Sequence, residues 1–201
     1  MSQGARTGCL GLALLVLGAA PSLADRVPNQ AVSRDSAGWP IGDLALVDHQ
    51  GAPFSNENLR GRWTLLAIAD SRCGDPCDRT LTALASVLRR IAGARVIETT
   101  QVLVVSLRAE DRAADMTRLL APHDTQFIGA IGPPEGLAQL ADDLGIPNSP
   151  AAGHRTAALG APDHAGSVWL IGPDAVIRAE FLPPFDGPLL TAEYLKTRLR
   201  G

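Results

Sequence analysis

Continuous apolar runs alternate along the chain with segments of mixed polarity. The runs at 63–69 and 102–107 are typical of strands buried on both faces, and 127–131 is a shorter candidate of the same kind. An earlier strand is predicted at 44–47, where apolar residues lead into a polar turn at 48–51. These four segments predict the strands of one central sheet.

Segments with helical spacing of apolar residues lie between these strands. From 77 to 91 apolar residues recur every three or four positions, which predicts a helix directly after the first long strand. Shorter helices are predicted at 113–120 and at 134–144, the second with Pro134 in its first turn. Strands that alternate with helices in this way form parallel pairs joined by crossover helices.

The C-terminal part of the chain has a different pattern. Residues 145–163 lack periodicity and are rich in proline, glycine, alanine and serine, which predicts a long surface loop. Apolar strands at 168–171 and 176–181 form a predicted hairpin, and 189–199 is a predicted last helix. Together the elements predict an α/β thioredoxin-like fold, with a central mixed sheet, flanking helices and a C-terminal β-hairpin plus helix.

Residues 1–24 are predicted to be a signal peptide. Arg6 precedes an apolar stretch that begins at Cys9, and small residues precede a cleavage position after Ala24. A retained membrane anchor is the alternative, but the stretch is shorter than the roughly 20 apolar residues of a spanning helix. Polar residues 25–40 predict a flexible leader, and 41–201 are predicted to be one domain. We therefore expect an exported, periplasmic protein, tethered to the membrane if the signal is not cleaved.

Composition and charge narrow the range of functions. The chain has 201 residues, 46% of them hydrophobic, and a formal net charge of −3, so one domain with a real core and no basic surface for nucleic acid is expected. We also expect a monomer. Loss of the signal peptide removes Cys9 and leaves Cys73 and Cys77 as the thiols of the mature chain. Any thiol chemistry therefore depends on that pair.

The two cysteines lie at the junction between the strand 63–69 and the helix that follows it. Three residues separate them, so their thiols are about one helical turn apart. Such a pair can clamp a metal, and soft thiolates select copper(I), or zinc with further ligands. Exposed amides at a helix N-terminus also favour a thiolate, which makes a redox-active pair a second interpretation. A small structural disulfide is the third, although so short a loop restricts the unfolded chain little.

Three segments together resemble the Sco/SenC family. Residues 45–68 read ALVDHQGAPFSNENLRGRWTLLAI and precede Cys-x-x-x-Cys, as at the opening of Sco/SenC proteins. Residues 163–174, DHAGSVWLIGPD, resemble the family's Asp-His, four residues, an aromatic residue and Leu-Ile-Gly-Pro-Asp. Residues 127–135, FIGAIGPPE, match its F-I-G-x-x-G-x-x-E. The resemblance covers about 41–199 and implies a thioredoxin-like fold.

The resemblance also implies a site and an activity. Its histidine corresponds to His164, which would be the third copper ligand beside Cys73 and Cys77. The implied function is a metallochaperone that holds one copper, as Cu(I) or Cu(II), and delivers it to an exported acceptor. In the family that acceptor is the copper site of cytochrome c oxidase, and a thiol reductant protein is a further expected partner. The alternative is a thiol-disulfide oxidoreductase, an enzyme in which Cys73 and Cys77 are the catalytic redox pair.

The sequence departs from the family at several positions. Gly74 and Asp78 follow the two cysteines where the family usually has proline. Arg108 stands where the family often has an aspartate after the second long strand, so a neighbouring acid is missing unless Glu110 or Asp111 substitutes for it. These differences bear on the finer activity more than on copper binding.

Other polar and aromatic residues have a less specific interpretation. His49, His123 and His154 are interpreted as solvated surface histidines, although His154, in the long loop, could approach the site. The pair 142–143 of aspartates is interpreted as a solvated helix face. The three tryptophans are interpreted as packing residues: Trp39, Trp63 and Trp169.

Overall fold

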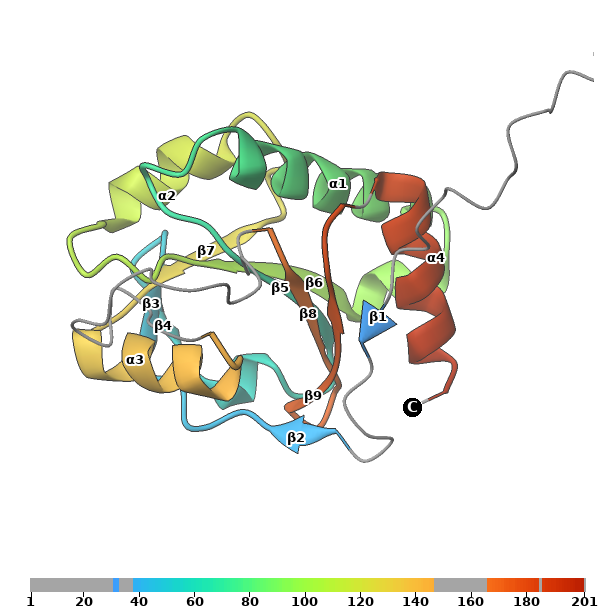
Figure 1. Cartoon of the computed structure of the whole chain (residues 1–201), viewed down its shortest axis with the longest axis horizontal. Coiled ribbons are helices and arrows are strands. Elements are labelled where there is room, and N and C mark those ends of the chain that lie inside the picture. Colours follow the sequence, from blue (N-terminus) through green and yellow to red (C-terminus); the bar gives the residue numbers. More distant parts are fainter. Residues whose placement is uncertain (1–30, 33–37, 147–165, 185, 201) are drawn as a thin grey trace, which may run out of the picture.

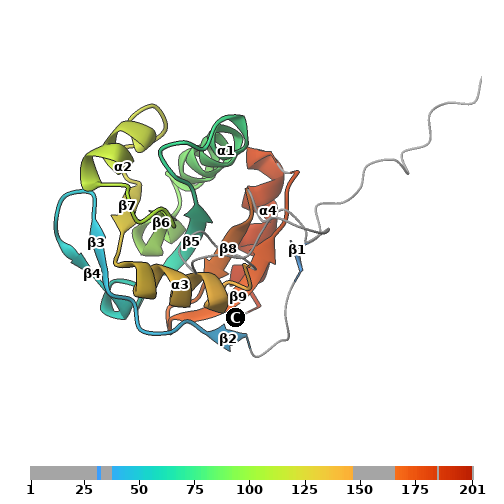
Figure 2. The same cartoon turned by 60° about the vertical axis from the view of Figure 1, so that its left-hand side comes forward.

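One mixed sheet with helices on both faces forms the fold (Figures 1 and 2). A computed structural model describes residues 31–32, 38–146, 166–184 and 186–200. The strands within these residues are β1 (Ala31–Val32), β2 (Trp39–Pro40), β3 (Leu46–Asp48), β4 (Pro53–Phe54), β5 (Trp63–Ile68), β6 (Thr100–Val105), β7 (Ile128–Ile131), β8 (Val168–Ile171) and β9 (Val176–Phe181). They form the order β1-β9-β8-β5-β6-β7-β3-β4, and β2 also pairs with β9.

The three central strands β5, β6 and β7 are parallel, and the other pairs are antiparallel. Strand β5 has β6 on one side and β8 on the other, with Ala67 opposite both Val104 and Val168. The carboxyl ends of β5 and β6 and the amino end of β8 therefore lie at the same edge of the sheet. This edge carries the cysteine pair.

Within the described residues, four α-helices cover the two faces of the sheet. They are α1 (Asp75–Ile91), α2 (Ala113–Leu120), α3 (Pro134–Asp143) and α4 (Gly187–Arg198), and short 3-10 helices occur at Asn56–Asn58 and Arg95–Thr99. Figure 2 shows α1, α2 and α4 on one face and α3 on the other. No helix within the described residues is long and apolar enough to cross a membrane.

Alternate residues of the central strands belong to two separate cores. Leu65 and Val104 pack toward α1, whereas Leu66 and Leu103 pack in the core that includes α3. Every residue of β6 is buried. This two-sided burial explains why the sequence shows continuous apolar runs rather than strict alternation.

Two short strands of the N-terminal segment pair with β9 at one margin of the sheet. Strands β1 and β2 lie within 25–40, where a flexible leader was expected, and both pair with β9. Asp143 also attaches the segment around β2 to α3. Its carboxylate accepts the N–H of Gly42 at 2.7 Å, and its carbonyl accepts the indole N–H of Trp39 at 2.7 Å. The interpretation of Asp143 as a solvated residue was therefore wrong, because segments about 100 residues apart meet there.

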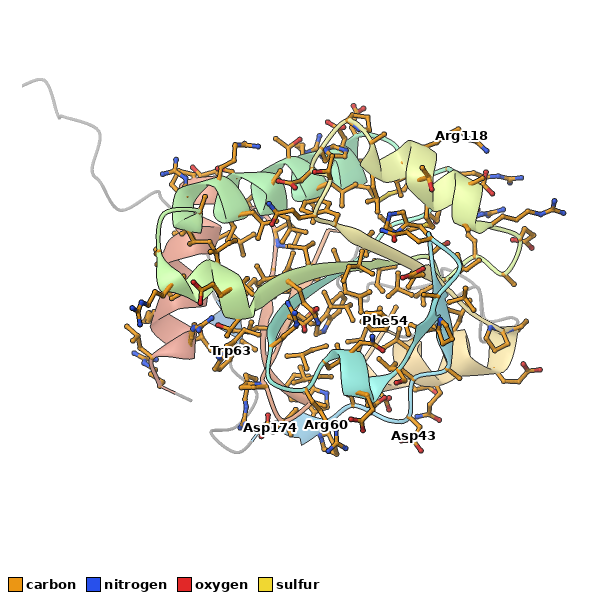
Figure 3. All side chains as sticks on the ribbon, turned by 180° about the vertical axis from the view of Figure 1, so that it is seen from behind. Asp43, Phe54, Arg60, Trp63, Arg118 and Asp174 are labelled. Carbon is orange, nitrogen blue, oxygen red and sulfur yellow. A yellow bond between two sulfur atoms is a disulfide. The ribbon has the colours of Figure 1, made fainter. Side chains whose placement is uncertain are left out.

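A polar cluster holds α4 against the amino ends of β5 and β6. The Tyr194 hydroxyl lies 2.6 Å from the Thr100 hydroxyl and accepts a hydrogen bond from Arg198 at 2.9 Å. The Arg198 guanidinium also lies 5.8 Å from the ring centroid of Trp63, where a cation–π contact is favourable. Figure 3 labels Trp63, which lies beside α4 at this end of the sheet. Trp63 and Trp169 are core residues, as predicted.

We expect Tyr194→Phe to lower the free energy of unfolding by about 1–2 kcal/mol, because it leaves a buried hydroxyl and a guanidinium with one partner fewer. Chemical denaturation of both proteins measures the difference. Arg200→Ala, an exposed arginine just beyond α4, is the control and should have no comparable effect. Equal stability of Tyr194→Phe and wild type would contradict a stabilising role for the cluster.

Candidate metal centre

Cys73 and Cys77 lie where β5 passes into α1, at the carboxyl edge of the parallel strands (Figure 1). They form a disulfide with 5.8 Å between their Cα atoms. Ligand sites of open α/β sheets occur at this edge, because several strand ends and helix N-termini meet there. The predicted placement of the pair at a strand-helix junction is confirmed.

The two cysteines differ in their access to solvent. Cys77 is 3% exposed and lies in the core, in the first turn of α1, with its Sγ 3.9 Å from the Ile68 carbonyl oxygen. Cys73 is half-buried, and its N–H donates to the Asp70 carbonyl at 3.1 Å in the turn that ends β5. A partner that approaches from solvent therefore meets Cys73 first.

Charges around the pair are mixed. The first turn of α1 has no side-chain cap at Gly74, and the positive end of the helix dipole there favours a thiolate. Asp75 and Asp78, in the same turn, oppose this effect, and both are exposed.

Asp111 connects the cysteine loop with the end of β6. One of its carboxylate oxygens accepts the Ser71 hydroxyl at 2.6 Å, and the other accepts the Ser71 N–H at 2.9 Å and the Ser106 hydroxyl at 2.8 Å. The guanidinium Nε of Arg108 is 3.6 Å from the same carboxylate. Burial raises the pKa of Asp111, but the hydrogen bonds from Ser71 and Ser106 and the charge of Arg108 outweigh it, so the pKa is lowered below 3.8.

A second connection joins α1 to the amino end of β8. The Thr80 hydroxyl lies 3.3 Å from the Gly166 carbonyl oxygen and 3.2 Å from that of Pro76. Gly166 has φ +92°, a conformation that favours glycine, and a Cβ there would lie 3.0 Å from the Thr80 hydroxyl oxygen. The segment before β8 is thus held against the turn of α1 that follows Cys77.

This architecture and the sequence both match one group of proteins. The SCO1/SenC family model matches residues 37–197. The chain belongs to the SCO1/SenC family. A Stutzerimonas stutzeri protein, named as copper-binding, is 34% identical over 148 residues, which are 72% of this chain and 70% of that protein.

Solved structures of Sco proteins have the same thioredoxin-like fold. Yeast Sco1 with copper bound matches with a TM-score of 0.66 and 19% identity, over 80% of this chain and 92% of the yeast chain. BsSco matches with a TM-score of 0.62 and 12% identity, over 83% of this chain and 97% of its own. Its structure is described as identifying a disulfide switch in a member of the Sco family of cytochrome c oxidase assembly proteins. The predicted fold class is confirmed.

The histidines of this Sco/SenC protein divide into two groups. His154 and His164 lie outside the described residues. His49 is half-buried, and its Nδ1 accepts the Gly129 N–H at 3.1 Å. The His123 side chain is 8% exposed, with Nε2 3.5 Å from a carboxylate oxygen of Asp78. The interpretation of His49 and His123 as solvated surface residues was wrong, because both contact residues that are distant in the sequence.

Neither of these two histidines joins the cysteine pair. Within residues 38–146 and 166–200, no three histidine, cysteine, aspartate or glutamate side chains are grouped so that they could hold a metal ion.

Arg108 occupies the position at which the family often has an aspartate, and the structure shows which nearby acid contacts the cysteine loop instead. Glu110 is largely exposed and pairs with Arg108 at 3.2 Å, whereas Asp111 reaches Ser71, two residues before Cys73. Sequence reasoning left both residues open and missed Ser71, Ser106 and Thr80. The available signal for Ser71 and Ser106 was their position, since both follow strands whose carboxyl ends share an edge.

We expect Asp111→Asn to lower the free energy of unfolding at neutral pH by about 1–3 kcal/mol, because hydrogen bonds to an ionised carboxylate are lost. The pKa of Asp111 is lowered in the folded chain, so its contribution is fully present above 3.8 and is lost as the pH falls through the folded value. Chemical denaturation of wild type and Asp111→Asn at pH 7 and at about pH 3 measures how the stability difference changes with pH. A difference that is independent of pH would contradict the role of the carboxylate charge.

Proposed function

We propose that this Sco/SenC protein is an exported copper chaperone that binds one copper ion through Cys73, Cys77 and His164. It passes the ion to a copper-accepting protein, and a cytochrome c oxidase subunit is the acceptor we propose first. Family membership and the copper-binding names of its relatives support the metal. The contact between Thr80 and Gly166 is the observation in this chain that supports His164 as a ligand beside the two cysteines.

That contact supports the choice of His164, because it brings Gly166 close to the helix that carries Cys77. Thr80 is three residues after Cys77, which is nearly one turn of α1. Gly166 is hydrogen-bonded to Thr80 and follows His164 by two residues, which span at most about 7 Å. The position of Gly166 beside the first turns of α1 therefore supports the proposal of His164 as the third ligand, although the sequence separates it widely from the pair.

The cysteine pair fits copper as a cargo. Metal–sulfur bonds of about 2.3 Å require the two sulfurs to be roughly 4 Å apart. With 5.8 Å between their Cα atoms, the side chains of Cys73 and Cys77 can meet that requirement once the disulfide is reduced. Soft thiolates favour copper(I), and an added imidazole suits copper(II).

The disulfide connects copper binding to a redox step. A thiolate is the ligand, so the oxidised pair offers no site and must first accept two electrons and two protons. We therefore propose a thiol reductant protein as a second partner, alongside the copper acceptor. Export to the periplasm, where disulfides persist, is consistent with this cycle.

A thiol-disulfide oxidoreductase is the second candidate function. The unequal burial of the two sulfurs favours it, because an accessible Cys73 could attack a partner disulfide and a buried Cys77 could resolve the mixed disulfide. The two functions are compatible, because both begin from the reduced pair.

A copper titration of the reduced full chain with Cys9→Ser tests the first function. We expect one copper per chain in the reduced form and none in the disulfide form. His164→Ala should weaken copper(II) binding most, because two thiolates still hold copper(I), and it should remove or shift the sulfur-to-copper(II) charge-transfer band.

His154→Ala is the matched control, since both histidines lie in the segment before β8. Loss of copper(II) in His154→Ala with an unchanged His164→Ala would make His154 the ligand. Equal copper affinity in both redox forms would refute a thiolate site. An unchanged copper(II) spectrum in His164→Ala together with impaired reduction of a partner disulfide would place the oxidoreductase first.

Thr80→Val tests the contact on which the placement of His164 depends. The substitution keeps the volume but removes the hydroxyl that reaches Gly166, so we expect copper(II) affinity to fall by about tenfold, the effect of about one lost hydrogen bond. Thr191→Val is the control, because Thr191 is also buried and bonds only the carbonyl of Gly187 in its own helix. Equal losses of affinity in the two variants would show that general destabilisation is responsible.

A further inference from the structure

The carboxylate of Asp111 is a bridge between two loops at the carboxyl edge of the sheet. Asp111 is 7% exposed, and it accepts three hydrogen bonds, two from Ser71 and one from the Ser106 hydroxyl. Ser106 is itself fixed, because its N–H donates to the Ala130 carbonyl at 3.0 Å. The bridge therefore ties the loop before Cys73 to the rigid end of β6.

The identity of the residue matters for this bridge. All groups that face its two oxygens are donors, namely the Ser71 hydroxyl and N–H, the Ser106 hydroxyl and the guanidinium of Arg108. An ionised carboxylate accepts all of them, whereas an amide would present its own N–H₂ to at least one of these donors. Asp111→Asn therefore breaks part of the bridge with almost no change in volume.

The loop that carries Cys73 has few other attachments. The Ala69 N–H donates to the Val105 carbonyl at 3.1 Å, and the Cys73 N–H donates within the loop, to the Asp70 carbonyl. A Cβ on Gly74 would meet nothing within 4 Å, so that side of the loop is open. Among the described residues, Asp111 is the side chain from outside the loop that hydrogen-bonds to 70–74.

Cys77, by contrast, is held in place. It is buried in the core and belongs to the first turn of α1. A disulfide requires Cα atoms about 4.4–6.8 Å apart, so its formation depends on whether the loop keeps Cys73 within reach of Cys77. Any restraint on the loop lowers the conformational entropy that disulfide formation must remove.

We infer that Asp111 is a positioning residue that sets the balance between the disulfide and dithiol forms of Cys73 and Cys77. It acts through Ser71, and it does not touch the reacting sulfurs. This inference rests on the proposed function only in taking the cysteine pair as the working site. By restraining the loop, Asp111 favours the disulfide and so determines how strong a reductant is needed before copper can bind.

Equilibration with glutathione measures this balance without copper. The Cys73–Cys77 bond breaks as two glutathione thiols give up two electrons and two protons, and oxidised glutathione forms. The full chain with Cys9→Ser is the background, and alkylation followed by mass spectrometry counts the free thiols. We expect Asp111→Ala and Asp111→Asn to lower the equilibrium constant for the disulfide about tenfold, which corresponds to about 30 mV.

Three further variants separate positioning from stability. Ser71→Ala keeps the Ser71 N–H bond, so it should shift the balance less, and adding it to Asp111→Ala should cause no further shift. Asp143→Ala removes a similar anchor, the carboxylate that accepts the Gly42 N–H in another part of the fold, and should leave the balance unchanged.

An unchanged balance in folded Asp111→Ala would overturn the inference, and so would an equal shift in Asp143→Ala. If Asp111→Ala does not fold, Ser71→Ala is the test variant. A wild-type disulfide–dithiol balance in Ser71→Ala would then overturn the inference. Failure of copper binding would leave this result intact, because the glutathione equilibrium contains no metal.

Discussion

The pairing of β5 with two different neighbours is the constraint on which the site depends. Strand β6 runs parallel to β5 on one side, and β8 runs antiparallel to it on the other. The end of β5, the end of β6 and the beginning of β8 must therefore share one edge. The cysteine loop, the loop of Asp111 and the segment that follows His164 meet there because of this arrangement, although they are far apart in the sequence.

The site has a rigid half and an adjustable half. Cys77 is fixed by the core and by α1, whereas Cys73 belongs to a loop that is held from one side. A metal carrier needs both properties. A preformed anchor reduces the cost of binding, and a partner must still be able to reach a ligand and take the ion. A very rigid pair would hold copper well and release it slowly.

The elements of the central sheet could be predicted from local patterns, because two-sided burial leaves a continuous apolar signature in β5 and β6. The position of the cysteine pair was also predictable from local pattern, because the pair lies between a predicted strand and a predicted helix. The roles of Asp111, Thr80 and Asp143 were not predictable, because each depends on a partner that only the tertiary structure brings near. His49 and His123 were misinterpreted for the same reason.

The outer margins of the sheet restrict how another chain can approach. At one margin β9 is covered by two short strands from the N-terminal segment. At the other, β4 has two residues, and the first is a proline that lacks an amide hydrogen. Within the described residues, neither margin offers a long row of free peptide groups, so strand addition, a common route to both peptide recognition and aggregation, is disfavoured there. A partner in the proposed copper transfer would instead meet the loops around the cysteines.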